Sequence, residues 1–243
     1  MKRGFYTIMS AQFFSSLADN ALFVTAVELL RTNGAPEWQR AALVPMFALF
    51  YVILAPFVGA FADALPKGRV MFISNAIKIV GCLMMLFGNH PLLAYAVVGL
   101  GAAAYSPAKY GILTELLPAS QLVKANGWIE GLTITSIILG VLVGGQLLSP
   151  GISAHLLDFD LPLLDTGVDT AAEAAIAVLV GVYALAAWFN LRIPLTDTVL
   201  RPLRQDPSKS LLANTLALLP DFWTCSQRRS EERRVGKECR SRW

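Results

Sequence analysis

Two charged side chains lie inside long apolar runs of this sequence, where an isolated charge is costly. Asp19 follows Phe5 by 14 residues, so a helix rise of about 1.5 Å per residue places it roughly 21 Å along its run, well inside hydrocarbon. A carboxylate at that depth costs about 2.5–3.5 kcal/mol and usually marks a transport pathway or has a partner. Asp19 therefore has two interpretations: it binds a substrate, or it pairs with a neighbouring helix for structure alone.

The neighbour of Asp19 and a lysine in a later run extend this polar chemistry. Asn20 offers hydrogen-bond donors and an acceptor, which suits a head group that carries both an amine and a phosphate. Lys78 follows Val70 by eight residues and so lies roughly 12 Å deep. Its ammonium either binds phosphate as a point charge or extends to the membrane surface on its apolar stem.

A second polar pair precedes a stripe of small residues. Asn126 and Glu130 are four residues apart and share one face of a helix, either as a polar pair linked to a gate or as an ordinary pair at a helix start. The glycines of the later stripe allow another helix to pack closely against Gly140, Gly144 and Gly145. The two histidines lie in separate predicted loops, and the sequence indicates no metal or cofactor site.

The composition as a whole is that of a membrane protein. Of the 243 residues, 55% are hydrophobic and 15% are charged, against about 25% charged residues in an average soluble domain. A bilayer core of about 30 Å needs about 20 mostly apolar residues per helix, and it tolerates no unpaired backbone groups. We expect an all-α polytopic bundle with six spans, at residues 6–30, 41–62, 70–87, 92–105, 128–148 and 171–189.

The basic residues of the short loops predict the orientation of this bundle. A cytoplasmic N-terminus leaves only Arg31 and Arg40 outside. All other loop cations then fall on the cytoplasmic side: Lys2, Arg3, Lys67, Arg69, Lys109, Lys124, Arg192, Arg201, Arg204 and Lys209. We therefore expect a multi-pass protein with its N-terminus in the cytoplasm.

Composition divides the chain into three parts. Residues 1–192 form the predicted bundle, and residues 193–228 form a polar linker with a short apolar helix that Pro220 interrupts. Residues 229–243 have no apolar period and resemble a translated sequencing adapter. Their six Lys and Arg and three Glu supply the whole net charge of +3, so that charge does not indicate a nucleic-acid partner. The alternative is a basic tail that binds anionic membrane lipid.

The loop after the second apolar run carries a motif formed by Gly59, Asp63, Gly68 and Arg69. Gly59 allows two helices to approach, Gly68 permits a tight turn, and the opposite charges of Asp63 and Arg69 can hold neighbouring helix ends together. This motif resembles the loop signature of the major facilitator superfamily, in which it holds the inner gate closed. The alternative is an ordinary turn within a basic cluster.

A narrower resemblance extends over residues 11–148. The segments that carry it are 12–21, 56–59, 67–70, 99–115 and 122–127, and they are similar to the bacterial lysophospholipid transporter family. The resemblance implies the N-terminal half of an inner-membrane carrier that moves lysophosphatidylethanolamine and lysophosphatidylglycerol inward, where a partner acyltransferase re-acylates them. We expect substrate binding by Asp19, Asn20, Lys78, Tyr105 and Lys109, and gating by Gly59, Asp63, Gly68, Arg69, Asn126 and Glu130.

Enzyme motifs are missing from the sequence. It contains no Gly-x-x-x-x-Gly-Lys-Ser/Thr loop, no His-Glu-x-x-His and no Gly-x-Ser-x-Gly, so we expect transport and not catalysis. One alternative is a major facilitator carrier of another amphiphile or a drug, which would share the Asp63 loop but not the 105–111 run. The other is a binding or scaffold protein that is complete in 243 residues.

Overall fold

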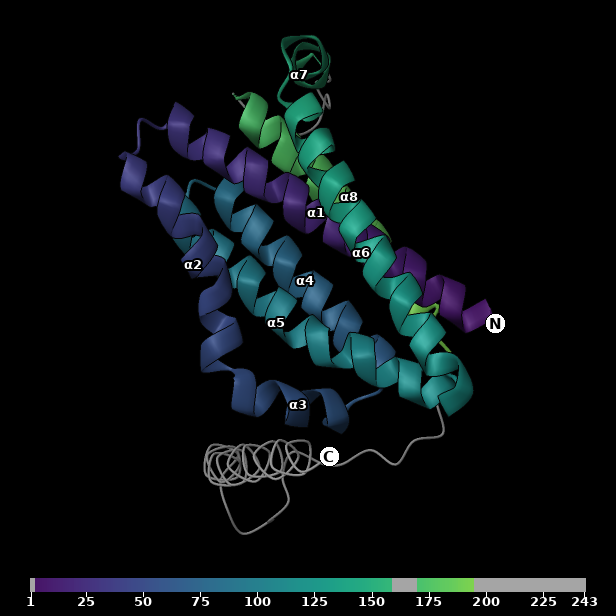
Figure 1. Ribbon diagram of the computed structural model, residues 1–243. Coiled ribbons are helices and arrows are strands. Elements are labelled where there is room, and N and C mark those ends of the chain that lie inside the picture. Colours follow the sequence, from purple (N-terminus) through teal and green to yellow (C-terminus); the bar gives the residue numbers. More distant parts are fainter. Residues whose placement is uncertain (1–2, 159–169, 195–243) are drawn as a thin grey trace, which may run out of the picture.

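The computed structural model describes residues 3–158 and 170–194. This part of the chain is all-helical. Its helices, drawn in Figure 1, are α1 (Arg3–Thr32), α2 (Glu37–Ile53), α3 (Ala55–Ala64), α4 (Lys67–Leu86), α5 (Pro91–Leu116), α6 (Ala119–Leu147), α7 (Pro150–Leu157) and α8 (Ala171–Leu191). The expected all-α membrane fold is confirmed.

Five of these helices are each long and apolar enough to cross a membrane: α1, α4, α5, α6 and α8. The pair α2 and α3 passes the same test only as one broken span, bent by 69°. With the pair counted once, the described part of the chain has the six spans that the apolar runs predict. In Figure 1, α3 lies across the lower end of the bundle, and its axis points in a different direction from that of α2.

The prediction of one continuous helix over residues 41–62 was wrong. Helix α2 ends at Ile53, and α3 begins at Ala55 with a proline in its first turn. A proline lacks the N–H that would continue the hydrogen-bond ladder, and its ring clashes with the carbonyl four residues earlier. In the first turn of a new helix that N–H is not needed, so Pro56 favours a helix start at this point.

The prediction that the fourth span ends at residue 105 was also wrong. Helix α5 continues through Pro107 to Leu116. Prolines are tolerated inside membrane helices because neighbouring helices and local adjustments compensate for the lost backbone bond. The extension places Lys109 and Tyr110 on the helix, not in a loop.

The fifth span starts earlier than its apolar run. Helix α6 begins at Ala119, whereas the apolar run begins at residue 128. Asn126 and Glu130 therefore lie two to three turns into the helix. This position excludes the interpretation of the two residues as a helix-start pair.

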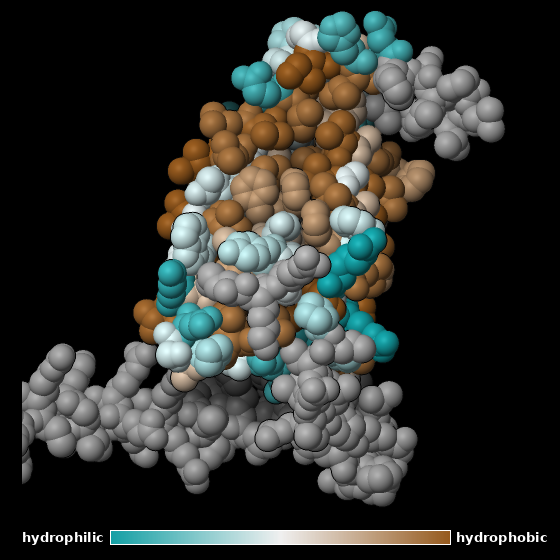
Figure 2. All heavy atoms as spheres, turned by 90° about the vertical axis from the view of Figure 1, so that its right-hand side faces the viewer, coloured by the Kyte–Doolittle hydropathy of each residue, from teal (hydrophilic) through white to brown (hydrophobic). Residues whose placement is uncertain are grey.

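The links between helices lie at two opposite ends of the bundle, the motif end and the far end. The motif end holds Gly4, the α2–α3 link at Leu54, the α3–α4 link at Pro66 and the α5–α6 link at Pro118, and the far end holds the α1–α2 and α4–α5 links. Helix α1 packs against α6 and α8, and α4 packs against α5 and α8. Figure 2 shows apolar residues over the middle of the face turned to the viewer, with polar residues above and below.

Glycines set the closest helix contacts. A Cβ placed on Gly140 of α6 would lie 2.5 Å from the carbonyl oxygen of Leu17 in α1, and one on Gly144 would lie 2.8 Å from that of Ala21. Gly145, the third member of the predicted stripe, faces open space. Two glycines spaced by one turn therefore bring the backbones of α1 and α6 together.

The boundaries predicted after the bundle fall largely outside the described residues. Arg192, Ile193 and Pro194 follow the end of α8. The rest of the predicted linker lies outside the described residues. The short apolar helix and the adapter-like tail, residues 229–243, lie beyond this region.

The glycine contact leads to a stability prediction. Gly140→Ala should destabilise the purified protein by about 1–3 kcal/mol, because the new methyl meets backbone that cannot rotate away. Gly145→Ala is the matched control, since its methyl enters open space and alanine favours a helix. Thermal melting in detergent measures both variants. Equal melting temperatures for the two variants would contradict the proposed packing role.

Candidate functional site

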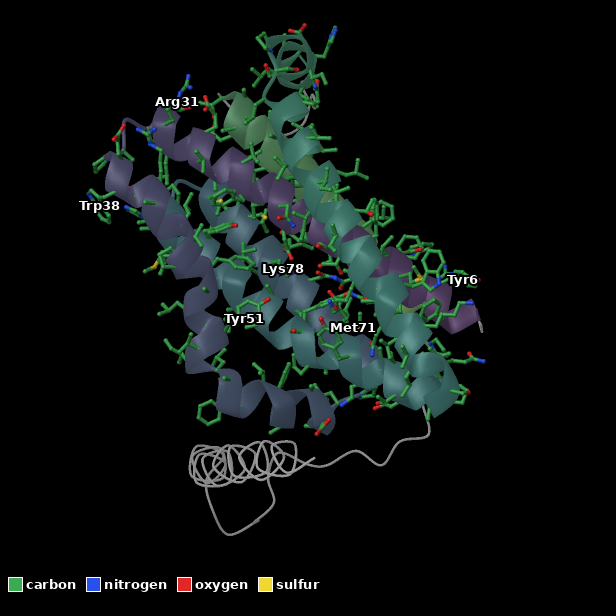
Figure 3. The ribbon with its side chains drawn as sticks, in the orientation of Figure 1. Tyr6, Arg31, Trp38, Tyr51, Met71 and Lys78 are labelled. Carbon is green, nitrogen blue, oxygen red and sulfur yellow. The ribbon has the colours of Figure 1, made fainter. Side chains whose placement is uncertain are left out.

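An ion pair joins α1 to α4 inside the bundle. The Lys78 ammonium donates to Asp19 Oδ2 at 2.7 Å and to Ser15 Oγ at 3.0 Å. The lysine side chain is 1% exposed and the aspartate side chain 20%. Figure 3 places Lys78 near the middle of the bundle, far from Arg31 and Trp38 at one end and from Tyr6 at the other. Lys78 is therefore an internal cation, and the interpretation that it extends to the membrane surface was wrong.

Further side chains hold this pair in place. Tyr183 of α8 donates its hydroxyl to Asp19 Oδ1 at 2.8 Å. Ser15, which accepts from Lys78, donates in turn to Asn75 Oδ1 at 2.8 Å. The Lys78 ammonium also lies 5.2 Å from the ring centroid of Tyr105 and 5.6 Å from that of Tyr183. Aromatic faces attract a cation at these distances, so the charge is compensated on several sides.

Two of these supporting residues could have been found in the sequence. Ser15 precedes Asp19 by four residues and Asn75 precedes Lys78 by three, so each shares a helix face with a buried charge. Tyr183 lies in the most apolar run and has no polar neighbour at helical spacing. Only the packing of α8 against α1 and α4 brings it to the carboxylate.

Polar side chains of α1, α2, α4, α5 and α6 line a cavity of about 160 Å³ next to the ion pair. Gln12 donates to Thr133 Oγ1 across this cavity at 3.2 Å. The other polar groups at its wall are those of Ser15, Ser16, Asp19, Tyr51, Lys78, Tyr105, Ser106 and Lys109. The structure therefore brings four of the five predicted substrate-binding residues to one cavity: Asp19, Lys78, Tyr105 and Lys109.

The fifth residue, Asn20, lines a second cavity of about 340 Å³. Its amide nitrogen donates to the Ser16 carbonyl of its own helix at 2.8 Å, so one of its two N–H donors is already occupied. Most of the wall is apolar or aromatic, formed by Phe23, Val44, Phe47, Tyr51 and Tyr95. Asp19 and Tyr51 belong to the walls of both cavities, so a polar and an apolar compartment meet at these two residues.

Lys109 takes part in a small cluster that links α5 to α6. Its ammonium lies 3.9 Å from Glu130 Oε1 and 4.5 Å from the ring centroid of Tyr110. Tyr110 donates its hydroxyl to the same Glu130 oxygen at 2.7 Å. Asn126 lies exposed one turn earlier on α6. The contacts shown for Glu130 therefore go to α5, whereas the sequence suggested a pair with Asn126.

The motif loop is held together by a different cation from the one expected. Lys67 donates to Asp63 Oδ1 at 2.5 Å and to the Ala62 carbonyl at 2.8 Å, and its ammonium lies 4.0 Å from Glu115 of α5. The expected pairing of Asp63 with Arg69 is therefore replaced by one with Lys67. Lys67 follows Asp63 by four residues, across the link between α3 and α4, and Arg69 is exposed on the first turn of α4.

The two motif glycines also act differently from the prediction. Gly68 lies in α4 without a left-handed backbone, and a Cβ there would be 3.1 Å from the carbonyl oxygen of Asn190. Its role is therefore close packing against the end of α8, not a tight turn. A Cβ on Gly59 would meet nothing within 4 Å, so the described residues show no close helix contact at that position.

Comparison with known proteins identifies the family of this chain. The chain is 42% identical over 194 residues to the lysophospholipid transporter LplT of Yersinia enterocolitica, and 43% identical to those of Yersinia pestis and Yersinia pseudotuberculosis. These matches cover 80% of this chain, which spans 43% of the length of each relative. The profile of the Major Facilitator Superfamily matches residues 8–226. The chain is thus a multi-pass membrane protein, and it belongs to the major facilitator superfamily.

Proposed function

We propose that this chain is the first helical bundle of a carrier that moves lysophospholipids across the bacterial inner membrane. The observation that carries the proposal is the pair of cavities that meet at Asp19 and Tyr51. One cavity is polar and holds both signs of charge, and the other is lined by aromatic and aliphatic side chains. A single-chain phospholipid has the same division, and the similarity to the Yersinia transporters supports this substrate class.

The charges of the polar cavity suit a phospholipid head group. The wall holds two cations, Lys78 and Lys109, and one anion, Asp19; Glu130 lies outside the wall, 3.9 Å from the Lys109 ammonium, and offsets part of this positive charge. A phosphodiester supplies the opposite charge, and the ammonium of ethanolamine or the hydroxyls of glycerol can bind the carboxylate. Phe23, Phe47 and Tyr95 offer the adjoining apolar surface to the acyl chain.

Transport itself requires more than this bundle. Carriers of this class bind substrate between two bundles and expose it alternately by rocking one bundle against the other. Because the chain spans 43% of the Yersinia relatives, we assign transport to a whole carrier with a second bundle. We place the motif end in the cytoplasm, as the basic loops favour, so that an acyltransferase on that side receives the lipid.

Long-read sequencing of the source locus across codon 228 gives the reading frame of the whole carrier, which the uptake and binding experiments require.

A carrier of another amphiphile or a drug is the second candidate. The Asp63 loop would serve that carrier equally, whereas the Tyr105 to Lys109 segment lines the polar cavity and lies in the stretch shared with the lysophospholipid family. Competition decides between the two candidates. Unlabelled lysophosphatidylethanolamine should displace its labelled form from the carrier in proteoliposomes, and single-chain cationic detergents of the same length should not.

Asp19→Ala should abolish lysophospholipid uptake by the whole carrier and should also lower its stability, because it leaves Lys78 buried without its anion. The double variant Asp19→Leu, Lys78→Met separates these effects, since it removes both charges. We expect it to restore the yield in the membrane but not the uptake of labelled lipid. Wild-type uptake by the double variant would remove Asp19 from the binding site and leave it a purely structural role.

Lys109→Ala should reduce uptake at least tenfold without reducing membrane insertion, because a charged contact to phosphate is worth about 1.5–3 kcal/mol. Lys124→Ala is the matched control, since Lys124 is exposed on α6 and lines neither cavity. Initial uptake rates are normalised to the carrier that is recovered from membranes. Equal rates for the two variants would exclude Lys109 from head-group binding.

Asp63→Ala should slow cycling more than it weakens substrate binding. The carboxylate lies at the motif end, lines neither cavity, and its contacts go to Lys67. Equilibrium binding to purified carrier should therefore stay near the wild-type value while the turnover number falls. Lys67→Ala should show the same pattern, because it removes the other member of the pair. Lost binding with unchanged turnover would contradict a gating role.

A further inference from the structure

We infer that Tyr183 is a positioning residue, which acts through Asp19 and determines how well the site distinguishes an ammonium-bearing head group from one without it. This inference rests on the proposed function, because it concerns the same polar cavity. Tyr183 belongs to α8, whereas the residues that the sequence assigned to the site belong to α1, α4 and α5. Its role is to orient the carboxylate, and we assign it no contact with the lipid.

The geometry around Asp19 supports this role. Each carboxylate oxygen has one fixed donor: Lys78 on Oδ2 at 2.7 Å and Tyr183 on Oδ1 at 2.8 Å. An ionised carboxylate has about four acceptor positions, so two donors still leave room for a third. Asp19 remains 20% exposed and lies on the walls of both cavities, so a ligand can reach these remaining positions.

Tyr183 is suited to orientation because it is itself immobile. Its side chain is fully buried, and α8 packs against both α1 and α4, the helices that carry the ion pair. Its ring also lies 5.6 Å from the Lys78 ammonium, so the same residue contacts both members of the pair. A side chain locked in this way by packing can hold a neighbouring group in one geometry.

Removal of the Tyr183 hydroxyl should change the orientation of the Asp19 carboxylate more than its charge. With no donor on Oδ1, the carboxylate is free to turn both oxygens toward Lys78, the strong donor that remains. An ammonium needs an anionic acceptor at a fixed place, because charge-assisted hydrogen bonds depend on short distances. A glycerol head group binds through neutral hydroxyls and depends less on that place. The loss should therefore be selective for ethanolamine.

The test compares two lysolipids on the whole carrier. Binding of lysophosphatidylethanolamine and of lysophosphatidylglycerol is titrated on purified protein, and uptake is measured in proteoliposomes. Tyr183→Phe keeps the ring and removes only the hydroxyl. We expect its affinity for the ethanolamine lipid to fall about tenfold relative to the glycerol lipid, the size that one hydrogen bond to a charged group implies. Tyr6→Phe, at an exposed position on α1, should leave this ratio unchanged.

Two further measurements separate positioning from general damage. Incorporation of p-aminophenylalanine in place of Tyr183 restores a donor at the same ring position, and it should return the ratio toward the wild-type value. Thermal melting shows whether Tyr183→Phe weakens the fold, and the p-amino variant provides the test if Tyr183→Phe is not recovered from membranes. A wild-type ratio in Tyr183→Phe, an equal loss for both lipids, or a p-amino variant that lacks ethanolamine preference would overturn the inference. A wild-type carrier that binds neither lysolipid would instead refute the proposed function.

Discussion

The ion pair between Asp19 and Lys78 is the interaction on which the rest of this structure depends. Two charges inside an apolar bundle are tolerated only where each has several compensating partners, because desolvation can exceed the attraction between them. Here the hydrogen-bonded groups come from three helices: Ser15 and Asp19 from α1, Lys78 from α4 and Tyr183 from α8. The close packing of these helices therefore serves the charges as well as the apolar core.

Small residues make that packing possible on both sides of the pair. Gly101 of α5 lies against the backbone of α4 beside Lys78, where a Cβ would be 2.6 Å from the Ser74 carbonyl oxygen. Gly140 of α6 lies against α1 beside Asn20 in the same way. Helices that approach this closely leave little room between their axes, so the polar groups are confined to one internal cavity. The apolar cavity lies beside it, lined by Phe47 of α2 and Tyr95 of α5, whose ring centroids are 5.2 Å apart.

Sequence alone predicts the number of spans, because each needs a long apolar run, and it finds the buried charges, because they interrupt such runs. Helix boundaries depend on context. Among the prolines in or beside apolar runs, Pro45 and Pro107 lie inside helices and Pro56 lies at a helix start, a difference that the proline itself does not decide. The partners of the charged residues were harder to predict from the sequence. Asp63 is followed by two basic residues, Lys67 and Arg69, and only the chain direction at the start of α4 decides in favour of Lys67. Tyr183 became visible only through tertiary packing.

Helix α6 contacts its neighbours through different kinds of interaction along its length. Near the far end it contacts α1 through Gly140 and Gly144, a dry van der Waals contact between backbones. Toward the motif end it is joined to α5 through Glu130, whose side chain is 51% exposed and whose contacts are ionic or hydrogen-bonded. Dissolved salt screens the exposed contact and leaves the dry one unchanged. Ionic strength therefore acts on the contact between α6 and α5, whereas the glycine contacts and the buried Ala125 and Ile129, which pack with Phe5 and Ile8 of α1, keep α6 on α1 at any salt concentration.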